Sequence, residues 1–152
     1  MLRDDVTLIS AVDVPTSDPT PWSLERLAIG EVVAGAYRVE GTLGRGGMSC
    51  VMLARDVTLD RPVALKFLAP ALLASPSWRA RFAFEARSMA GVRHPNVVGV
   101  HSFGVHEGWP FFAMEHVRGE DLRSWAATHP EPSIATVADL VGRIALGLDA
   151  IH

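Results

Sequence analysis

The sequence predicts an α+β protein in which an antiparallel sheet comes first and helices follow it. From residue 37 onward, short apolar runs alternate with polar residues and are separated by turn residues, which is typical of strands joined by hairpins. After residue 117, apolar residues recur at the three- and four-residue spacing of a helix. The 152 residues are 49% apolar, a composition typical of a folded chain with a core.

Three strands open the predicted sheet. The first begins at residue 37, and the turn Gly-Arg-Gly-Gly at residues 44–47 leads back into a second strand at residues 51–54. Another turn at residues 56–60 leads into a third strand at residues 63–68. Because this third strand is apolar apart from its lysine, we expect it to be buried on both faces.

A helix and a further pair of strands follow. Ser75 and Pro76 resemble an N-cap followed by a proline in the first helical position, and the helix is expected to end near Gly91. Strands are then predicted at residues 97–105 and 110–115, joined by the turn His-Glu-Gly-Trp.

The end of the chain is predicted to be helical, with a short helix at residues 122–128 and a longer one from about residue 136. One side of the longer helix is an apolar stripe made of Val137, Leu140, Val141, Ile144, Leu148 and Ile151. Nothing that follows in the sequence could cover this stripe, and each large apolar side chain left in water forfeits about 1.5–3 kcal/mol. We therefore expect self-association through the last helix, or degradation from the C-terminal end.

Residues 1–34 are predicted to be a flexible N-terminal extension. The first thirty of them mix Asp, Thr, Ser and Pro with few large apolar residues. Such a composition buries too little apolar surface to offset the entropy lost on folding.

Composition and charge exclude several classes of function. With 14 basic and 17 acidic residues the net charge is −3, which argues against nucleic acid as a partner. Cys50 is the only cysteine and the six histidines form no metal-binding motif, so we expect no disulfide and no metal site. There is no signal-peptide pattern and no window approaching the ~20 apolar residues of a membrane span. We therefore expect no membrane segment and a cytoplasmic location.

The glycine turn, residues 44–47, is a candidate phosphate-binding loop. Its bare backbone N–H groups could approach phosphate oxygens, although the same glycines could serve only the hairpin. The turn leads directly into a strand and lacks the Gly-Lys-Ser/Thr of a Walker loop. A dinucleotide-binding fold and a Walker loop are therefore both excluded.

Two charged residues lie in apolar surroundings. Lys66 is part of the third strand, and Glu85 follows Phe82 by three residues and precedes Met89 by four in the apolar stripe of a helix. A buried unpaired charge costs several kcal/mol, so we predict that the two form an ion pair. Taken alone, each could instead lie at a solvent-exposed margin.

In this order, the glycine turn, the Val-Ala-Leu-Lys strand and the helix with an inward glutamate resemble the small lobe of the protein kinases. Three segments are similar to sequence motifs of the bacterial serine/threonine kinases of eukaryotic type: residues 43–49, 93–98 and 114–117. The resemblance implies a protein-kinase-like small lobe at residues 35–117, formed by an antiparallel sheet plus one helix. The first helices of a truncated large lobe would follow at residues 118–152.

The resemblance assigns the glycine turn to ATP. Gly44 and Gly46 correspond to the first two glycines of the family's phosphate-binding loop, and Ser49 stands in the place of the third. A serine there keeps the backbone N–H but reduces the flexibility of the loop. Leu43 and Gly47 complete the implied contacts.

Further nucleotide contacts are implied in the strands and the helix. Val51 and Ala64 would cover the adenine, Lys66 would hold the α- and β-phosphates, and Glu85 would orient Lys66.

The segment after the last strand is implied to hold the adenine edge. Met114 resembles the gatekeeper, and the main chain of Glu115 and Val117 would form hydrogen bonds with the adenine. Asp121 could bind the ribose, or it could only cap a helix.

The complete kinase is expected to use ATP and Mg²⁺ to transfer the γ-phosphate to serine or threonine hydroxyls of protein substrates, which would dock on the missing large lobe. The sequence contains no His-Arg-Asp catalytic loop and no Asp-Phe-Gly magnesium site. We therefore expect these residues alone to be catalytically incomplete. The alternative is a non-catalytic module that binds nucleotide or protein.

Overall fold

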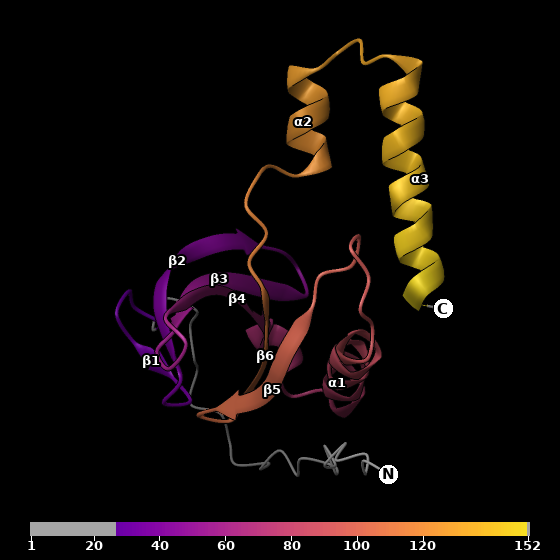
Figure 1. Ribbon diagram of the computed structural model, residues 1–152. Coiled ribbons are helices and arrows are strands. Elements are labelled where there is room, and N and C mark those ends of the chain that lie inside the picture. Colours follow the sequence, from indigo (N-terminus) through magenta and orange to yellow (C-terminus); the bar gives the residue numbers. More distant parts are fainter. Residues whose placement is uncertain (1–26, 152) are drawn as a thin grey trace, which may run out of the picture.

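The computed structural model describes residues 27–151, which form an antiparallel sheet with one packed helix and two further helices (Figure 1). The predicted α+β class is confirmed. The sheet has six strands in the order β1-β2-β3-β4-β6-β5. The strands are β1 (Val32–Val33), β2 (Tyr37–Arg45), β3 (Ser49–Asp56), β4 (Arg61–Leu68), β5 (Val100–His106) and β6 (Trp109–Glu115). The helices are the 3₁₀ helix η2 (Pro70–Leu72), α1 (Pro76–Ala90), α2 (Leu122–Thr128) and α3 (Ile134–Ile151).

Helix α1 begins where the sequence predicts. Ser75 is the N-cap residue and Pro76 the first helical residue, although the Ser75 hydroxyl bonds to the hydroxyl of Ser77, at 2.9 Å, rather than to a backbone N–H. The guanidinium Nε of Arg79 donates to the carbonyl of Leu73, which ties the first turn of the helix to the preceding segment. Proline fixes the backbone angle that the first helical position needs and loses no hydrogen bond there.

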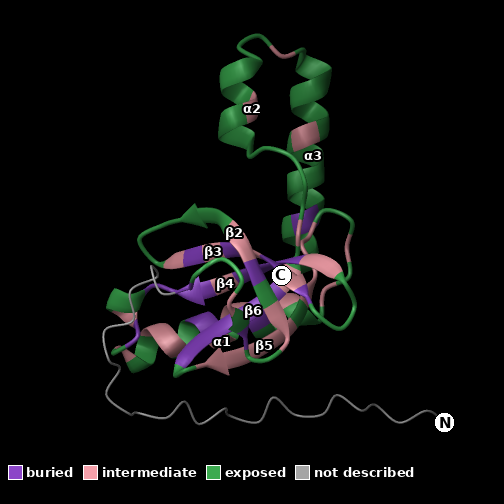
Figure 2. Ribbon diagram, turned by 90° about the vertical axis from the view of Figure 1, so that its left-hand side faces the viewer, coloured by how far each residue is buried: buried purple, intermediate pink, exposed green. Residues whose placement is uncertain are grey.

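The core is centred on strands β4 and β6, most of whose residues are buried (Figure 2). Phe67 packs against Phe111 at 5.5 Å between ring centroids and meets the edge of Trp109 at 6.1 Å. On the opposite face, Phe112 packs against Phe82 of α1 at 5.1 Å. The expectation that the third strand is buried on both faces is confirmed, because its residues except Lys66 are buried from position 63 to 68.

Residues 27–34, which the composition assigns to a flexible extension, pack on the sheet instead. Leu27 and Val33 are buried in the core, and β1 pairs with β2. His106 accepts a hydrogen bond at Nδ1 from the main-chain N–H of Ala34, at 3.2 Å, and its Nε2 lies 3.4 Å from Glu31. The other part of the predicted extension, residues 1–26, lies outside the described residues.

Some element boundaries differ from the predictions. Strand β5 begins at Val100 rather than at residue 97, because the chain first turns, with the Val97 N–H donating to the His94 carbonyl at 3.1 Å. Helix α3 begins at Ile134, two residues earlier than expected. Helix η2 was not predicted, since three residues are too short for a periodic pattern.

Helices α2 and α3 stand side by side beyond one end of the sheet (Figures 1 and 2). Gly147 is the buried residue of α3: a Cβ there would lie 2.9 Å from the Asn96 carbonyl oxygen, so only glycine permits this approach. Most large side chains of the predicted stripe are exposed, among them Val137, Val141 and Ile144. Within residues 27–151, no helix is long and apolar enough to cross a membrane.

Candidate functional site

The strand register brings the predicted adenine and phosphate residues onto one face of the sheet. Val51 of β3 lies opposite Lys66 of β4, and Lys66 lies opposite Phe112 of β6. One step along, Ala64 of β4 lies opposite Met114 of β6. Directly opposed residues of antiparallel strands, and residues two apart in one strand, point to the same face. This face is the one that α1 covers, because Lys66 reaches a residue of that helix.

The predicted ion pair between Lys66 and Glu85 is confirmed. The Lys66 Nζ lies 2.5 Å from the Glu85 Oε1 and connects the centre of the sheet to α1. The expectation that both side chains point inward is only partly met, since the Lys66 side chain is 23% exposed and that of Glu85 44% exposed. Water weakens the attraction between the charges of a partly exposed ion pair. The relative positions of β4 and α1, rather than complete burial of the charges, therefore bring these two groups together.

Lys66 is also the only lysine of the chain; the remaining 13 of its 14 basic residues are arginines. Arginine supplies a permanent, spread-out charge, whereas the lysine ammonium is a compact point charge with rotatable donors. A chain that uses arginine at every other basic position has a lysine at the centre of this face. Residue counting in the sequence could have found this signal.

The packing of the glycine turn does not require its glycines. A Cβ added to Gly44 or Gly47 would meet no heavy atom within 4 Å, and at Gly46 the nearest atom is the Ser49 carbonyl oxygen at an ordinary 3.7 Å. None of the three has a positive φ. The Gly46 N–H donates to the Ser49 carbonyl at 2.8 Å, which closes the turn. Larger side chains would fit at these positions, so the hairpin itself does not need the glycines. This favours the interpretation that the glycines let a ligand approach the backbone closely.

A cavity of about 230 Å³ lies between β4, α1 and the two residues that follow the glycine turn, Met48 and Ser49. Its lining includes Ser49, Lys66 and Glu85, so it brings together three of the predicted residues. The rest of the lining is formed by Met48, Leu68, Trp78, Arg81 and Phe82, which the sequence did not point to. The phosphate end of the predicted site is therefore a hollow with a charged edge and apolar walls.

Two of the residues predicted to contact the adenine edge lie elsewhere, at and just after the end of β6. Glu115 and Val117 line a separate cavity of about 330 Å³ together with residues 95–98. The Glu115 N–H already donates to the Gly99 carbonyl at 2.8 Å, so the Glu115 main chain can offer an adenine its carbonyl oxygen. Five predicted residues thus line one of these two cavities, whereas the others line neither of them: Leu43, Gly44, Gly46, Gly47, Val51, Ala64, Met114 and Asp121. Two of the predicted adenine contacts, Leu43 of β2 and Val117, are exposed to solvent.

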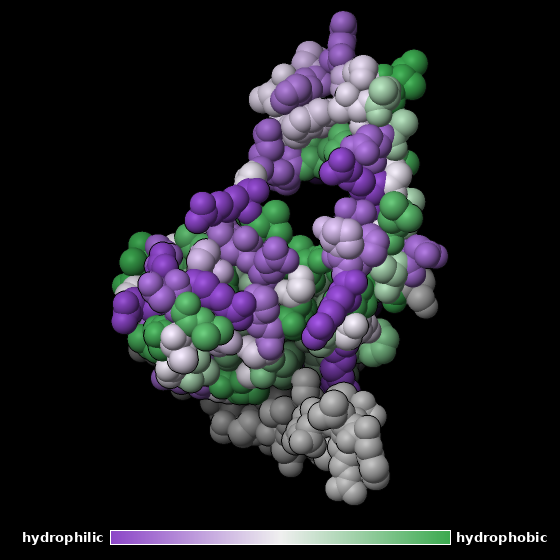
Figure 3. Space-filling model, viewed as in Figure 1, coloured by the Kyte–Doolittle hydropathy of each residue, from purple (hydrophilic) through white to green (hydrophobic). Residues whose placement is uncertain are grey.

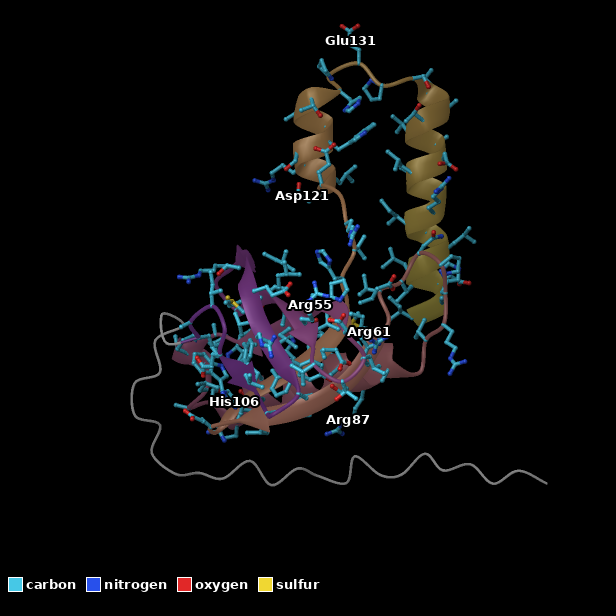
Figure 4. All side chains as sticks on the ribbon, turned by 60° about the vertical axis from the view of Figure 1, so that its left-hand side comes forward. Arg55, Arg61, Arg87, His106, Asp121 and Glu131 are labelled. Carbon is cyan, nitrogen blue, oxygen red and sulfur yellow. The ribbon has the colours of Figure 1, made fainter. Side chains whose placement is uncertain are left out.

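Asp121 caps α2, which is the second of the two alternatives that the sequence left open. Its carboxylate accepts a hydrogen bond from the Ser124 N–H at 2.7 Å (Figure 4). This bond from the backbone stabilises the charged form and lowers the pKa of Asp121 below its ordinary value. A role in ribose binding stays a prediction.

Within residues 27–151, no group of three or more His, Cys, Asp or Glu side chains is placed to hold a metal ion. The thiol of Cys50 is buried, and burial raises its pKa, an effect that nearby Arg45 partly opposes. A buried thiol with a raised pKa is a poor nucleophile at neutral pH.

A glycine hairpin beside a strand lysine, with a helical glutamate paired to that lysine, is the arrangement of the protein kinase small lobe. The protein kinase domain family matches residues 37–152. The chain therefore belongs to this family, and the resemblance drawn from the sequence is confirmed.

The relatives are bacterial serine/threonine-protein kinases. PknJ of Mycobacterium tuberculosis is 42% identical over 126 residues, which cover 83% of this chain and 21% of that protein. PrkC of Bacillus subtilis is 32% identical over 123 residues, which cover 78% of this chain and 19% of that protein. The crystal structure of the M. tuberculosis PknI kinase domain aligns with a TM-score of 0.70 at 33% identity, covering 82% of this chain and 51% of that domain. The chain thus spans about a fifth of the curated relatives and half of a kinase domain.

Proposed function

We propose that this chain is the ATP-binding part of a serine/threonine protein kinase. The observation that carries the proposal is the Lys66–Glu85 pair beside a glycine turn whose glycines the packing does not require. Residues 35–117 would form the small lobe, and residues 118–152 the first helices of the large lobe. The family membership and the names of the relatives support this division.

In this proposal each residue near the phosphates has one task. The Lys66 ammonium donates hydrogen bonds to the α- and β-phosphates, and Glu85 holds that ammonium toward α1. The N–H groups of the glycine turn other than that of Gly46, which donates to the Ser49 carbonyl, approach the phosphate oxygens, with Ser49 at the end of the turn. Val51, Ala64 and Met114 face the adenine from the same side of the sheet.

Protein kinases in general use ATP and Mg²⁺, and ATP supplies the γ-phosphoryl group. The sequence contains neither a His-Arg-Asp nor an Asp-Phe-Gly motif, and no described cluster fits a metal ion, so we derive no transfer step from these residues. The complete protein, in our proposal, phosphorylates serine or threonine hydroxyls of protein substrates in the cytoplasm. These residues by themselves would bind the nucleotide without turning it over.

The proposal is tested by the reactivity of the lone lysine. Acylation of Lys66 by a neutral succinimidyl ester is followed by mass spectrometry, with the α-amino group as the internal reference. Saturating ATP is expected to slow labelling of Lys66 relative to that reference, because hydrogen bonds to the phosphates keep the Lys66 amine protonated and shield it from the ester. Adenosine, which lacks phosphates, is expected to give little protection.

Replacing Lys66 by Met is expected to weaken ATP binding, measured by calorimetry, by about tenfold to a hundredfold, because a charge-assisted hydrogen bond contributes about 1.5–3 kcal/mol. Arg87→Met is the matched control, since Arg87 is an exposed cation on α1. Equal loss in both variants, or equal protection by ATP and adenosine, would contradict the proposed phosphate site.

A second candidate function is supported by the apolar surface of α3. Large side chains on one side of this helix, such as Val141 at 58% and Leu148 at 53%, are exposed to solvent, and apolar residues are visible along α3 (Figure 3). A contiguous apolar surface of this kind marks an interaction site. We propose that copies of this chain associate through α3.

Sedimentation velocity over a range of concentrations tests this association. We expect the wild-type chain to sediment as a concentration-dependent oligomer, and the double variant Val141→Lys/Ile144→Lys as a monomer, because burying an ammonium in the contact is costly. Ala135→Lys adds one such charge on the side of α3 that carries Asp139 and serves as the control. A wild-type chain that is monomeric at all concentrations refutes the contact.

A further inference from the structure

Phe112 lies against the lysine of the ion pair. The Lys66 Nζ is 5.5 Å from the centroid of the Phe112 ring, and the two residues are directly opposite each other in β4 and β6. The ring is fully buried, whereas Glu85 on the other side of the ammonium is half-exposed. A cation within about 6 Å of an aromatic centroid is attracted by the negative face of the ring. The ammonium therefore contacts one partly solvent-exposed group, the Glu85 carboxylate, and one buried group, the Phe112 ring.

The same ring also contacts the helix that carries Glu85. Phe112 packs against Phe82 with the ring centroids 5.1 Å apart. Phe82 precedes Glu85 by three residues in α1, so both side chains project from the same side of the helix. Phe103 touches Phe82 from the neighbouring strand, at 6.3 Å, and forms no described contact with Lys66. Phe112 is thus the described ring that contacts both Lys66 and the α1 side chain one turn from Glu85.

We propose that Phe112 is a positioning residue for Lys66. The face of its ring holds the ammonium on the inner side, and its contact with Phe82 keeps α1 at the distance where Glu85 reaches the ammonium. The pair needs this support because a half-exposed ion pair contributes little by itself: water competes for both charges. The effect on the ion pair is independent of any nucleotide; the consequence for ATP affinity rests on the function proposed above.

Fluorinated phenylalanines test the proposal in the full chain, because fluorine withdraws electrons from the ring face while nearly preserving its shape. Phe112 is replaced by difluoro- and then trifluorophenylalanine through nonsense suppression, and the acylation rate of Lys66 is measured without nucleotide. We expect the rate to rise stepwise with fluorination, to about three- to fivefold for the trifluoro ring, the factor that corresponds to loss of a cation–π contact. The unfolding midpoint is expected to fall only slightly, because the weakened contact also stabilises the folded chain.

The same substitutions at Phe103 are the matched control, since that ring shares the contact with Phe82. Labelling of Lys66 is expected to stay at the wild-type rate there. The proposal would be overturned if the acylation rate of Lys66 did not respond to fluorination of Phe112, or if it rose equally on fluorination of Phe103. Either result would mean that Phe112 only packs in the core.

The nucleotide readout is kept separate. If ATP protects wild-type Lys66, the fluorinated Phe112 variants are expected to bind ATP more weakly in the same order as their labelling rates rise. If ATP gives no protection but the labelling rates still rise stepwise, the positioning role of Phe112 holds and the proposed ATP site fails.

Discussion

Replacing Trp109 by Ala is expected to lower the free energy of unfolding by about 3–5 kcal/mol. Trp109 is 1% exposed, its ring meets Phe67 edge-on at 6.1 Å, and its indole N–H donates to the Leu68 carbonyl at 2.5 Å. Removing a buried Trp side chain costs about 3–5 kcal/mol. A domain of this size is stable by only about 5–15 kcal/mol, so this single change removes a large share of it.

Urea denaturation followed by far-UV circular dichroism measures this loss. Trp109→Phe keeps most of the ring but leaves the Leu68 carbonyl without its donor, so we expect an intermediate loss of about 1–3 kcal/mol. Trp125→Ala, on α2 and away from the sheet, is the control and is expected to change stability little. The same midpoint for Trp109→Ala and Trp125→Ala would mean that Trp109 is not part of the stabilising core.

Exchanging the charges of Lys66 and Glu85 is expected to separate the structural role of the pair from its role toward phosphate. Lys66→Glu alone and Glu85→Lys alone each bring like charges to positions whose atoms lie 2.5 Å apart in the wild type. Each is expected to lower the free energy of unfolding by about 1–3 kcal/mol, because a charged hydrogen bond is lost. The double exchange restores opposite charges and is expected to recover most of this loss.

ATP binding is expected to respond differently from stability. With a carboxylate at position 66, the double variant repels phosphate even though its ion pair is re-formed, so its ATP affinity should stay at least about tenfold below the wild type. Thermal denaturation and calorimetric ATP titrations of the four proteins provide both quantities. Recovery of ATP affinity together with stability would show that position 66 does not contact the phosphates.

The elements that periodicity predicts are those whose side-chain pattern repeats within the element. The hairpin at residues 37–54, the strand at 63–68 and the helix from Pro76 follow from alternation, turn residues and capping, all of which are local. The Lys66–Glu85 pair was predicted because charges in apolar stretches need partners. That argument overestimated the burial of Glu85, since the sequence does not say how far from the margin of the helix–sheet contact a residue lies.

Contacts between distant segments could not be predicted in the same way. Nothing in residues 27–34 resembles a strand, yet Leu27 and Val33 complete the core because the neighbouring strand β2 offers free backbone groups for pairing. The contact of Phe112 with Lys66 depends on the register of β4 against β6, and a shift of one residue would turn that ring to the other face.

The order of residues along the chain therefore determined the family, the glycine turn, and a lysine and a glutamate that pair, because each rests on short-range spacing and on the cost of burying a charge alone. Only the tertiary structure decided which rings surround that lysine, how much water reaches its partner, and which of the predicted nucleotide residues line a cavity. Those properties arise from register and helix packing, which join residues far apart in the chain and leave no periodic trace in it.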